Sequence, residues 1–304
     1  MDRLKPARPA GPAWDMAGTV GPQAPDREAP HMAYEQIGYE LRDDVALVTL
    51  NRPERLNAWT TRMGQELTDA FGVANDDGSI GAIVVTGEGR GFCAGADIQD
   101  AFKADLDRHD EAGAPDRAAP DPKREPREPR IPEWVSVCRA SKPLLAAVNG
   151  AAIGVGLTMI LPFDFIVASD QAKLSCRFVK MGITPELASS HFLVSRMGWG
   201  AASDLALTGR IIESDEALAL RLVDAVVPHT DLVAHTIAKA RQFGDNPDPQ
   251  LRMIKELLTQ NAAEADLDEV QRREMTALAT ALRTPEHREA VSAFLEKRAP
   301  NFRS

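Results

Sequence analysis

The sequence predicts an α/β fold whose C-terminal part is helical. Four apolar runs, rich in β-branched residues, are typical of buried strands: Val45–Leu50, Ala82–Thr86, Leu144–Val148 and Phe165–Ala168. Helical patterns lie between these runs, and the chain after Glu186 is mostly helical. Strands that alternate with helices indicate an α/β core, and the closing helices indicate a separate helical layer.

The first two strands are separated by a helix with a clear start. The segment Asn51–Arg55 contains Pro53 and ends the first strand. Thr60 or Thr61 can cap a helix whose apolar residues recur at four-residue spacing: Met63, Leu67 and Phe71. The turn 87–91, rich in glycine, follows the second strand.

Three further helix starts or ends are readable in the second half of the chain. A short apolar helix is expected from about Gly154 to Leu161, where Pro162 stops it. Ser214 is expected to cap a helix that has acidic residues in its first turn, which suits the helix dipole. Thr284 is expected to cap another, with proline at its first position.

The chain divides into three parts by composition. Residues 1–33 are low in complexity and are predicted to form a disordered N-terminal tail. Residues 34–230 form the predicted core, which a proline-rich and charged insert at 103–130 interrupts. Residues 231–304 form the predicted C-terminal helical region.

Composition narrows the classes of function. Of the 304 residues, 44% are hydrophobic and 26% charged, as in ordinary globular proteins. The net charge of -10 argues against a partner made of nucleic acid, which needs a basic surface. No apolar run approaches the ~18 residues of a membrane span, so no membrane partner is expected. The three cysteines fit no metal or disulfide pattern and predict free thiols in a reducing cytoplasm.

Two glycine-rich stretches each follow a strand and lead toward a helix. They are 91–98, GFCAGADI, and 148–157, VNGAAIGVGL. Neither has the spacing of a dinucleotide-binding loop followed by an acid about 20 residues on. Small residues at such turns leave backbone N–H groups exposed, and two that converge make an oxyanion hole. Tight packing alone also explains each stretch, and spacing does not decide between the two.

The same stretches resemble the signature sequences of the crotonase family, the enoyl-CoA hydratase/isomerase superfamily. The resemblance rests on GRGFCAGADI and KPLLAAVNGAAIGVGLTMILPFDFIVAS, with NRPERLNAW before them and SAFLEKRAPNF near the end. It runs from about Tyr34 to Phe302. It implies a crotonase-like spiral of ββα units and a C-terminal helical trimerisation region, with trimers that often pair into hexamers.

The resemblance also implies a substrate and a set of binding residues. The substrate would be an acyl-CoA thioester, so coenzyme A is part of the substrate and no separate cofactor or metal is expected. The backbone N–H groups of Ala96 and Val155 would hold the thioester oxygen as it becomes an enolate. Family members commonly have glycine at the second position, where the Val155 side chain narrows the space. Coenzyme A would lie along six residues of one chain and two of a neighbouring subunit: Arg55, Leu56, Ala58, Ala94, Asp97 and Ile98, then Phe294 and Lys297.

The catalytic acid follows from what this chain has at three positions. Hydratases of the family use two glutamates, and their positions correspond here to Thr158 and Phe178. Isomerases keep a carboxylate eight residues after the second position, which is Glu186. One carboxylate suffices to move a proton from C2 to C4. The resemblance therefore implies a Δ3-Δ2-enoyl-CoA isomerase, although Thr184 could also cap a helix with Glu186 in its first turn.

Alternatives to this assignment remain open from sequence alone. They are an enoyl-CoA hydratase that uses Glu186 alone, a thioester hydrolase, and a non-catalytic acyl-CoA-binding scaffold. Four other polar residues are expected to play no catalytic part. Asp164 and Asp97 are expected to serve structure, and His191 to be packed or on the surface. Arg177 is expected to point away from Phe178, because side chains alternate along a strand.

Overall fold

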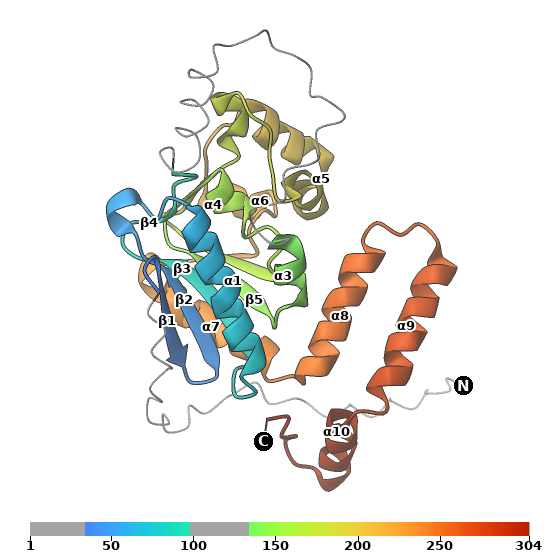
Figure 1. The fold of residues 1–304 in the computed structure, drawn as a ribbon. Helices are drawn as coiled ribbons and strands as arrows, with labels where there is room; N and C mark the ends of the chain where they lie inside the picture. The colour runs from blue at the N-terminus through green and yellow to red at the C-terminus, as the bar shows by residue number, and fades with distance from the viewer. Residues whose placement is uncertain (1–33, 98–133, 304) are drawn as a thin grey trace, which may run out of the picture.

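The computed structural model describes residues 34–97 and 134–303 (Figure 1). The predicted tail at 1–33, the predicted insert at 103–130 and Ile98 lie outside the described residues. Two sheets, the helices that cover them and a set of C-terminal helices make up the part described.

A six-stranded sheet has the order β1-β2-β3-β5-β7-β10. Its strands run parallel from β2 onward, and only β1 is antiparallel to its neighbour. The bounds are Ile37–Arg42 for β1, Val45–Leu50 for β2, Ala82–Gly87 for β3, Leu144–Val148 for β5, Phe165–Ser169 for β7 and Ala225–Val227 for β10. The four predicted strands are confirmed as β2, β3, β5 and β7.

Both faces of this sheet are buried, which explains why its strands are apolar without alternation. Alternate residues of β2 fall into two separate core clusters, with Ala46 and Val48 in one and Val45 and Leu47 in the other. Helix α1, Thr61–Asp76, packs in the first cluster. Helix α7, Leu232–Gly244, packs in the second, against β2, β3, β5 and β7.

A smaller sheet has the order β4-β6-β8-β9. Its strands are Gly91–Cys93 for β4, Ala151–Ile153 for β6, Lys173–Ser175 for β8 and Ile212–Glu213 for β9. Along the chain β4 follows β3, β6 follows β5 and β8 follows β7, so each turn of chain contributes one strand to each sheet. This repetition is the predicted spiral, and the fold class is confirmed.

The remaining elements of the core lie around the two sheets. The helices are α3, Trp134–Ala140; α4, Val155–Thr158; α5, Ser189–Thr208; and α6, Ser214–Ala219. Three short 3-10 helices are η1, Pro53–Arg55; η3, Arg177–Met181; and η4, His229–Asp231. In the part of the chain that is described, no helix has both the length and the apolar character to span a membrane.

The predicted helix starts and ends are correct in two cases and need correction in two. Thr60 caps α1 by accepting from the Met63 N–H, and Thr284 caps α10 by accepting from that of His287. Ser214 caps nothing: α6 begins at Ser214 itself, whose hydroxyl donates to the carbonyl of Asp170. Helix α4 ends at Thr158 rather than near Leu161, because the chain continues in tighter turns such as the bond from Leu161 N–H to the Thr158 carbonyl.

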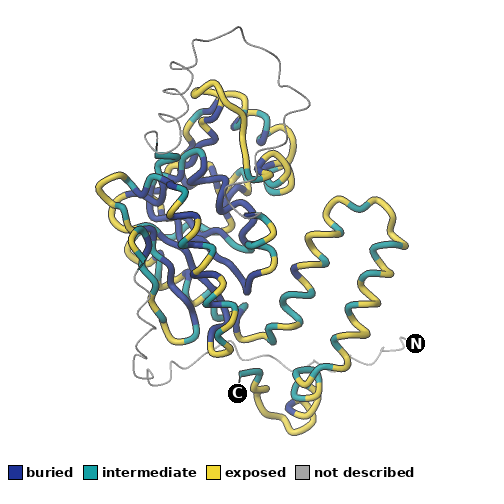
Figure 2. The backbone as a smooth tube through the Cα atoms, in the orientation of Figure 1, coloured by how far each residue is buried: buried dark blue, intermediate teal, exposed yellow. Residues whose placement is uncertain are grey.

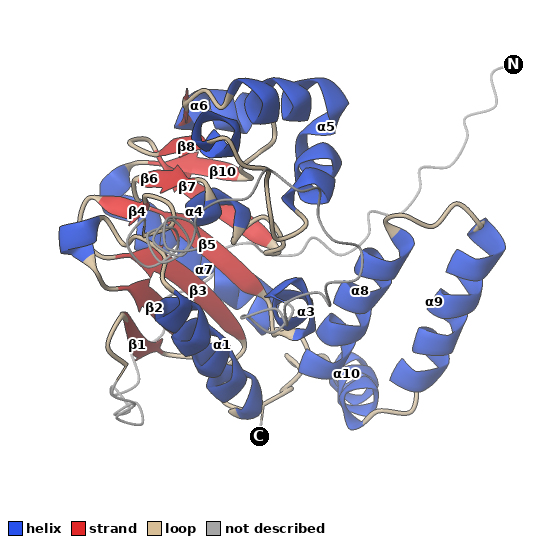
Figure 3. Ribbon diagram, turned by 45° about the horizontal axis from the view of Figure 1, so that its top comes forward, coloured by secondary structure: helices blue, strands red, loops and turns tan. Residues whose placement is uncertain are grey.

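Three C-terminal helices stand to one side of the sheets (Figure 3). They are α8, Asp248–Asn261; α9, Leu267–Ala281; and α10, Pro285–Glu296. They are mostly exposed or intermediate in burial (Figure 2). Helix α7 belongs to the predicted 231–304 region by sequence but packs as part of the core. The three cysteines are free, as predicted, and the structure shows that they are also buried.

Candidate active site

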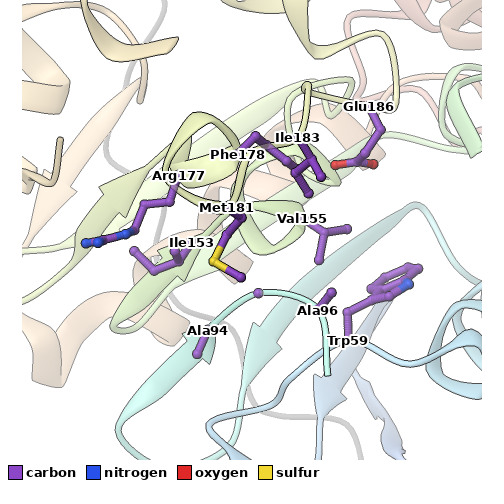
Figure 4. Close-up of a pocket in the computed structure, with 12 residues that line it drawn as sticks. Trp59, Ala94, Ala96, Ile153, Val155, Arg177, Phe178, Met181, Ile183 and Glu186 are labelled. Atoms are coloured by element: carbon purple, nitrogen blue, oxygen red, sulfur yellow. The ribbon is translucent and has the colours of Figure 1, made fainter. Parts of the chain in front are cut away.

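A pocket with a volume of about 430 Å³ lies where several loops meet the ends of β4 and β6 (Figure 4). Its lining comes from the loop after η1, the chain after β4, the start of α4, the helix η3 and the loop before α5. Most of the lining is apolar or backbone, and the full set is Trp59, Ala94, Gly95, Ala96, Ile153, Gly154, Val155, Arg177, Phe178, Met181, Ile183 and Glu186. The three residues predicted to take part in the reaction, Ala96, Val155 and Glu186, therefore share one pocket, together with the predicted coenzyme A residue Ala94.

The two predicted N–H donors each follow a glycine in a conformation that other residues rarely adopt. Gly95 has φ +114° before Ala96, and Gly154 has φ +56° before Val155. Val155 is the first residue of α4, where N–H groups have no partner inside the helix. Within the described residues, neither the Ala96 nor the Val155 N–H donates to a protein acceptor. Both donors are thus available to a ligand in the pocket.

Glu186 lies in the loop that joins η3 to α5. The two residues after it, Leu187 and Ala188, both have φ near +55°, a left-handed conformation that costs a non-glycine residue about 1–2 kcal/mol. Helix α5 begins only at Ser189, with Ala188 as its N-cap. The alternative of Glu186 in the first turn of a helix capped by Thr184 is therefore wrong. Left-handed backbone of this kind is concentrated at functional sites.

The Glu186 carboxyl group meets a buried hydroxyl. Thr158 Oγ1 donates to Glu186 Oε1 over 2.6 Å, and Thr158 is fully buried. Glu186 is exposed when the whole residue is counted, yet its carboxyl group is turned toward the pocket (Figure 4). Burial of this carboxyl raises its pKa above the ordinary value, and the bond from Thr158 opposes that rise. The surroundings of the carboxyl oxygens, rather than the exposure of the whole residue, determine the direction of the pKa shift, because the charge lies on those oxygens.

Phe178 and Arg177 both line the pocket, and the strand on which the prediction for Arg177 rested is not present. The prediction assumed a strand, but the two residues lie in η3, where neighbouring side chains do not alternate between opposite faces. Phe178 is buried, with 7% of its surface exposed. The guanidinium of Arg177 points away from Glu186 (Figure 4).

Five of the predicted coenzyme A residues form one neighbourhood at the pocket: Arg55, Leu56, Ala58, Ala94 and Asp97. The sixth of the core, Ile98, lies outside the described residues. The segment with Arg55, Leu56 and Ala58 runs along the chain after β4. The Ala94 N–H donates to the Leu56 carbonyl over 3.0 Å, and that of Asp97 to the Trp59 carbonyl over 2.8 Å. Leu56 adopts φ +50°, which helps the chain turn there.

Phe294 and Lys297 do not join this neighbourhood within one chain. Phe294 lies on α10 with 78% of its surface exposed, and Lys297 is the left-handed residue that ends this helix. Figure 1 shows α10 at the opposite end of the molecule from α4 and α5. A contribution of these two residues to the pocket requires a second copy of the chain.

The other polar candidates serve structure or lie on the surface, as predicted. Asp164 pairs with Arg139 at 2.9 Å and with Lys255 at 2.7 Å, and accepts from the Leu144 N–H. Asp97 pairs with Arg52 at 2.9 Å. His191 is exposed on α5. The described residues contain no cluster of side chains suited to a metal ion.

Four apolar lining residues were not predicted from sequence: Trp59, Ile153, Met181 and Ile183. Trp59 is 7% exposed and packs edge-on against Trp134 with ring centroids 5.7 Å apart. Met181 and Ile183 are exposed large apolar residues beside the pocket. They lie in η3 and the loop after it, where no hydrophobic period marks a face.

Comparisons with known proteins agree with this fold. Residues 40–304 match the family model for enoyl-CoA hydratase/isomerase. A probable enoyl-CoA hydratase of Mycobacterium bovis is 35% identical over 279 residues, which cover 89% of this chain and 99% of that protein. A 1,2-epoxyphenylacetyl-CoA isomerase of Escherichia coli is 33% identical over 271 residues, with 88% and 98% covered.

Solved structures give the same result. An enoyl-CoA hydratase from Bacillus anthracis superposes with a TM-score of 0.75 at 26% identity, covering 88% of this chain and 99% of that one. The chain therefore belongs to the enoyl-CoA hydratase/isomerase family, the crotonase family, whose enzymes act on acyl-CoA thioesters.

Proposed function

We propose that this protein is a Δ3-Δ2-enoyl-CoA isomerase with Glu186 as its acid and base. The observation that carries the proposal is the composition of the pocket: among its described lining residues Glu186 is the only carboxylate, and it shares the pocket with two unpaired N–H groups. That combination suits a proton transfer beside a thioester whose oxygen becomes negative.

The reaction runs in two proton transfers. The Glu186 carboxylate removes a proton from C2 of a 3-enoyl-CoA, and the electron pair moves onto the thioester oxygen. The N–H groups of Ala96 and Val155 stabilise this enolate oxygen, which carries the new charge. The protonated Glu186 then returns the proton at C4 while the double bond forms between C2 and C3. No atom is gained or lost, and the carboxylate is restored.

The environment of Glu186 supports this role. A general base works best when its pKa lies near the operating pH, and burial moves the pKa of Glu186 upward in that direction. The apolar walls of the same pocket include Phe178, Ile183 and Val155. Such apolar walls exclude water and strengthen interactions with the enolate.

A second candidate is an enoyl-CoA hydratase, which the names of several relatives favour. Against it, Phe178 has no acid–base group and fills the place of the hydratases' second glutamate. Thr158 stands at the first, and its hydroxyl is already engaged with Glu186. A hydratase here would have to position its water with Glu186 alone.

The remaining proposals concern the substrate and the assembly. We place coenzyme A, as part of the substrate, along Arg55, Leu56, Ala58, Ala94, Asp97 and Ile98. No separate cofactor is proposed. A homotrimer or a dimer of trimers would bring Phe294 and Lys297 of a neighbouring copy to this groove. The free, buried thiols support a cytoplasmic location.

The test is to replace Glu186 by glutamine, which keeps the shape but cannot accept the proton. Conversion of a 3-enoyl-CoA to the conjugated 2-enoyl-CoA, followed by thioester absorbance, should fall roughly 10²–10⁴-fold. Affinity for a saturated acyl-CoA, measured by calorimetry, should remain. Glu40→Gln, on the exposed edge strand β1, is the matched control and should keep full activity.

Four outcomes would contradict the proposal. Full isomerase activity in the Glu186→Gln variant would leave Glu186 with no catalytic part. Fast hydration of 2-enoyl-CoA by the wild type, without movement of a double bond, would identify a hydratase. Release of free thiol would identify a hydrolase, and binding without any turnover would identify a scaffold.

A further inference from the structure

We propose that Thr158 is a positioning residue that fixes one oxygen of Glu186 and leaves the other to carry the proton. The inference rests on the proposed function, in which Glu186 is the base. It assigns the short helix α4 two tasks, since the same helix supplies the Val155 N–H.

The contact is short and enclosed. Thr158 Oγ1 lies 2.6 Å from Glu186 Oε1, within the short range that is usual for a hydroxyl that donates to a carboxylate. Thr158 is fully buried, and within the described residues this is the one hydrogen bond of its hydroxyl. Because water does not reach the hydroxyl, the carboxylate is its partner. Among the described residues, no protein group donates to Oε2, which remains available to a substrate.

Helix α4 connects the hydrogen bond between Thr158 and Glu186 to the Val155 N–H, the proposed donor to the enolate oxygen. Val155 and Thr158 are its first and last residues, three positions apart. Residues at that spacing lie on the same side of a helix, about 4.5 Å apart along the axis. The donor for the enolate oxygen and the donor to the base are therefore parts of one rigid turn. A shift of α4 moves both together and preserves their separation.

The backbone at Glu186 makes a second support useful. Glu186 extends from a loop, and its side chain can adopt several rotamers because it has three rotatable bonds. The left-handed residues Leu187 and Ala188 fix the direction of the chain but not the carboxyl group at its end. The Thr158 hydroxyl fixes that end. A reacting group held in place avoids the loss of rate that a misplacement of about 1 Å causes.

Few other ionisable groups face the carboxyl. From η3 and its N-cap come Cys176, whose thiol has its pKa raised to about 12 by burial and so stays neutral, and Arg177, whose guanidinium points away (Figure 4). His191 on α5 is exposed and does not line the pocket. Helix α4 has no ionisable side chain, and its Thr158 contributes the neutral hydroxyl. The hydrogen bond favours the charged carboxylate and opposes the effect of burial, so its removal should raise the pKa of Glu186 further.

The experiment compares Thr158→Val, which keeps the shape and removes the hydroxyl, with Thr158→Ser, which keeps the hydroxyl. For Thr158→Val, kcat on a 3-enoyl-CoA should fall roughly 10–100-fold. The acidic limb of its pH profile should move to higher pH, and KM should change little. Thr158→Ser should restore most of the rate and the position of the limb. A Thr158→Val enzyme with the wild-type rate and profile would overturn the inference.

A readout that needs no activity separates this inference from the proposed function. The carboxyl carbon of Glu186 can be titrated by NMR in protein labelled with ¹³C-glutamate, with Glu186→Gln to assign the signal. Its pKa should be higher in Thr158→Val than in the wild type and in Thr158→Ser. Equal pKa values in all three proteins would refute the role of Thr158 whatever the reaction. A shifted pKa in a protein that moves no double bond would refute the isomerase instead.

Discussion

Gly156 packs against the backbone of Cys93 so closely that no side chain fits between them. A Cβ atom placed on Gly156 would lie 2.1 Å from the Cys93 carbonyl oxygen, well inside any real contact. Gly156 is the second residue of α4, and Cys93 ends β4, just before the loop with Ala96. The contact therefore sets the separation of the two loops that carry the proposed enolate donors.

Gly156→Ala should damage both stability and activity. The added methyl group must push α4 away from β4, which displaces the Val155 N–H and Thr158 together. Overpacking of this kind costs about 1–3 kcal/mol of the free energy of unfolding, measurable by denaturant titration. Isomerase activity should fall more than the loss of folded protein accounts for.

Gly72→Ala is the matched control for that variant. Gly72 is an exposed glycine within α1, and nothing lies within 4 Å of a Cβ atom placed there. The same substitution should raise the free energy of unfolding by about 0.5–1 kcal/mol, because alanine favours a helix. Equal stability and activity in Gly156→Ala and the wild type would show that the contact does not hold the site.

Glu186→Gln should make the protein more stable at neutral pH while it removes activity. The pKa of Glu186 is raised in the folded protein, so its contribution to stability is present below the unfolded pKa and is lost as pH rises through the folded pKa. The amide that replaces the carboxyl group in Glu186→Gln does not ionise, so the variant does not lose this stability as pH rises. The melting temperature of the variant should therefore exceed that of the wild type at pH 7, and the gap should close in acid.

The sign of the difference in melting temperature between Glu186→Gln and the wild type tests the direction of the pKa shift of Glu186. Thermal melts of both proteins across pH 4 to 8 measure it, with Glu40→Gln as the exposed control that should show no trend. A wild type that is more stable than Glu186→Gln at pH 7 would mean that the folded protein favours the charged carboxylate. The pKa of Glu186 would then be lowered rather than raised.

Phe178→Glu should add weak hydration activity. The substitution places a second carboxylate in the pocket beside Glu186, where the two can hold a water between them. Two carboxylates so close cannot both ionise easily, so the pKa of one should rise. The measurement is loss of the conjugated absorbance of a 2-enoyl-CoA. Phe178→Leu, which keeps an apolar wall, should show none, and equal hydration by both variants would mean that loss of the ring, rather than the new carboxylate, admits the water.

Sequence predicts the strands well and the loop that carries Glu186 poorly, for physical reasons. Strands β2, β3, β5 and β7 are buried on both faces, so their composition reports their structure directly. The backbone after Glu186 is left-handed at Leu187 and Ala188, two residue types that give no sign of it. The sequence therefore predicts a helix start here, and the structure shows that this prediction is wrong.

The lining of the pocket was predictable only where a motif or a backbone rule applies. Gly95 and Gly154 mark the turns before Ala96 and Val155, because their φ angles favour glycine. The hydrogen bond from Thr158 to Glu186 joins residues 28 apart in sequence, and no local pattern relates them. Met181 and Ile183 are apolar and exposed beside the pocket, which the burial rule for apolar residues does not anticipate.

The C-terminal helices should assemble the protein into trimers or hexamers. Many large apolar side chains of these helices are exposed in one chain, and water disfavours such a surface: Ile254, Leu258, Leu267, Met275, Leu278, Leu282, Val291, Phe294 and Leu295. Light scattering should give a mass of three or six times the 33.0 kDa chain.

Leu267→Asp, which charges a side chain 76% exposed in one chain, should reduce the mass and weaken acyl-CoA binding together, because Phe294 and Lys297 of a neighbour would be lost. Leu218→Asp on α6, also exposed, should leave the mass unchanged. A wild-type monomer at micromolar concentration that binds acyl-CoA fully would refute both the assembly and the shared groove.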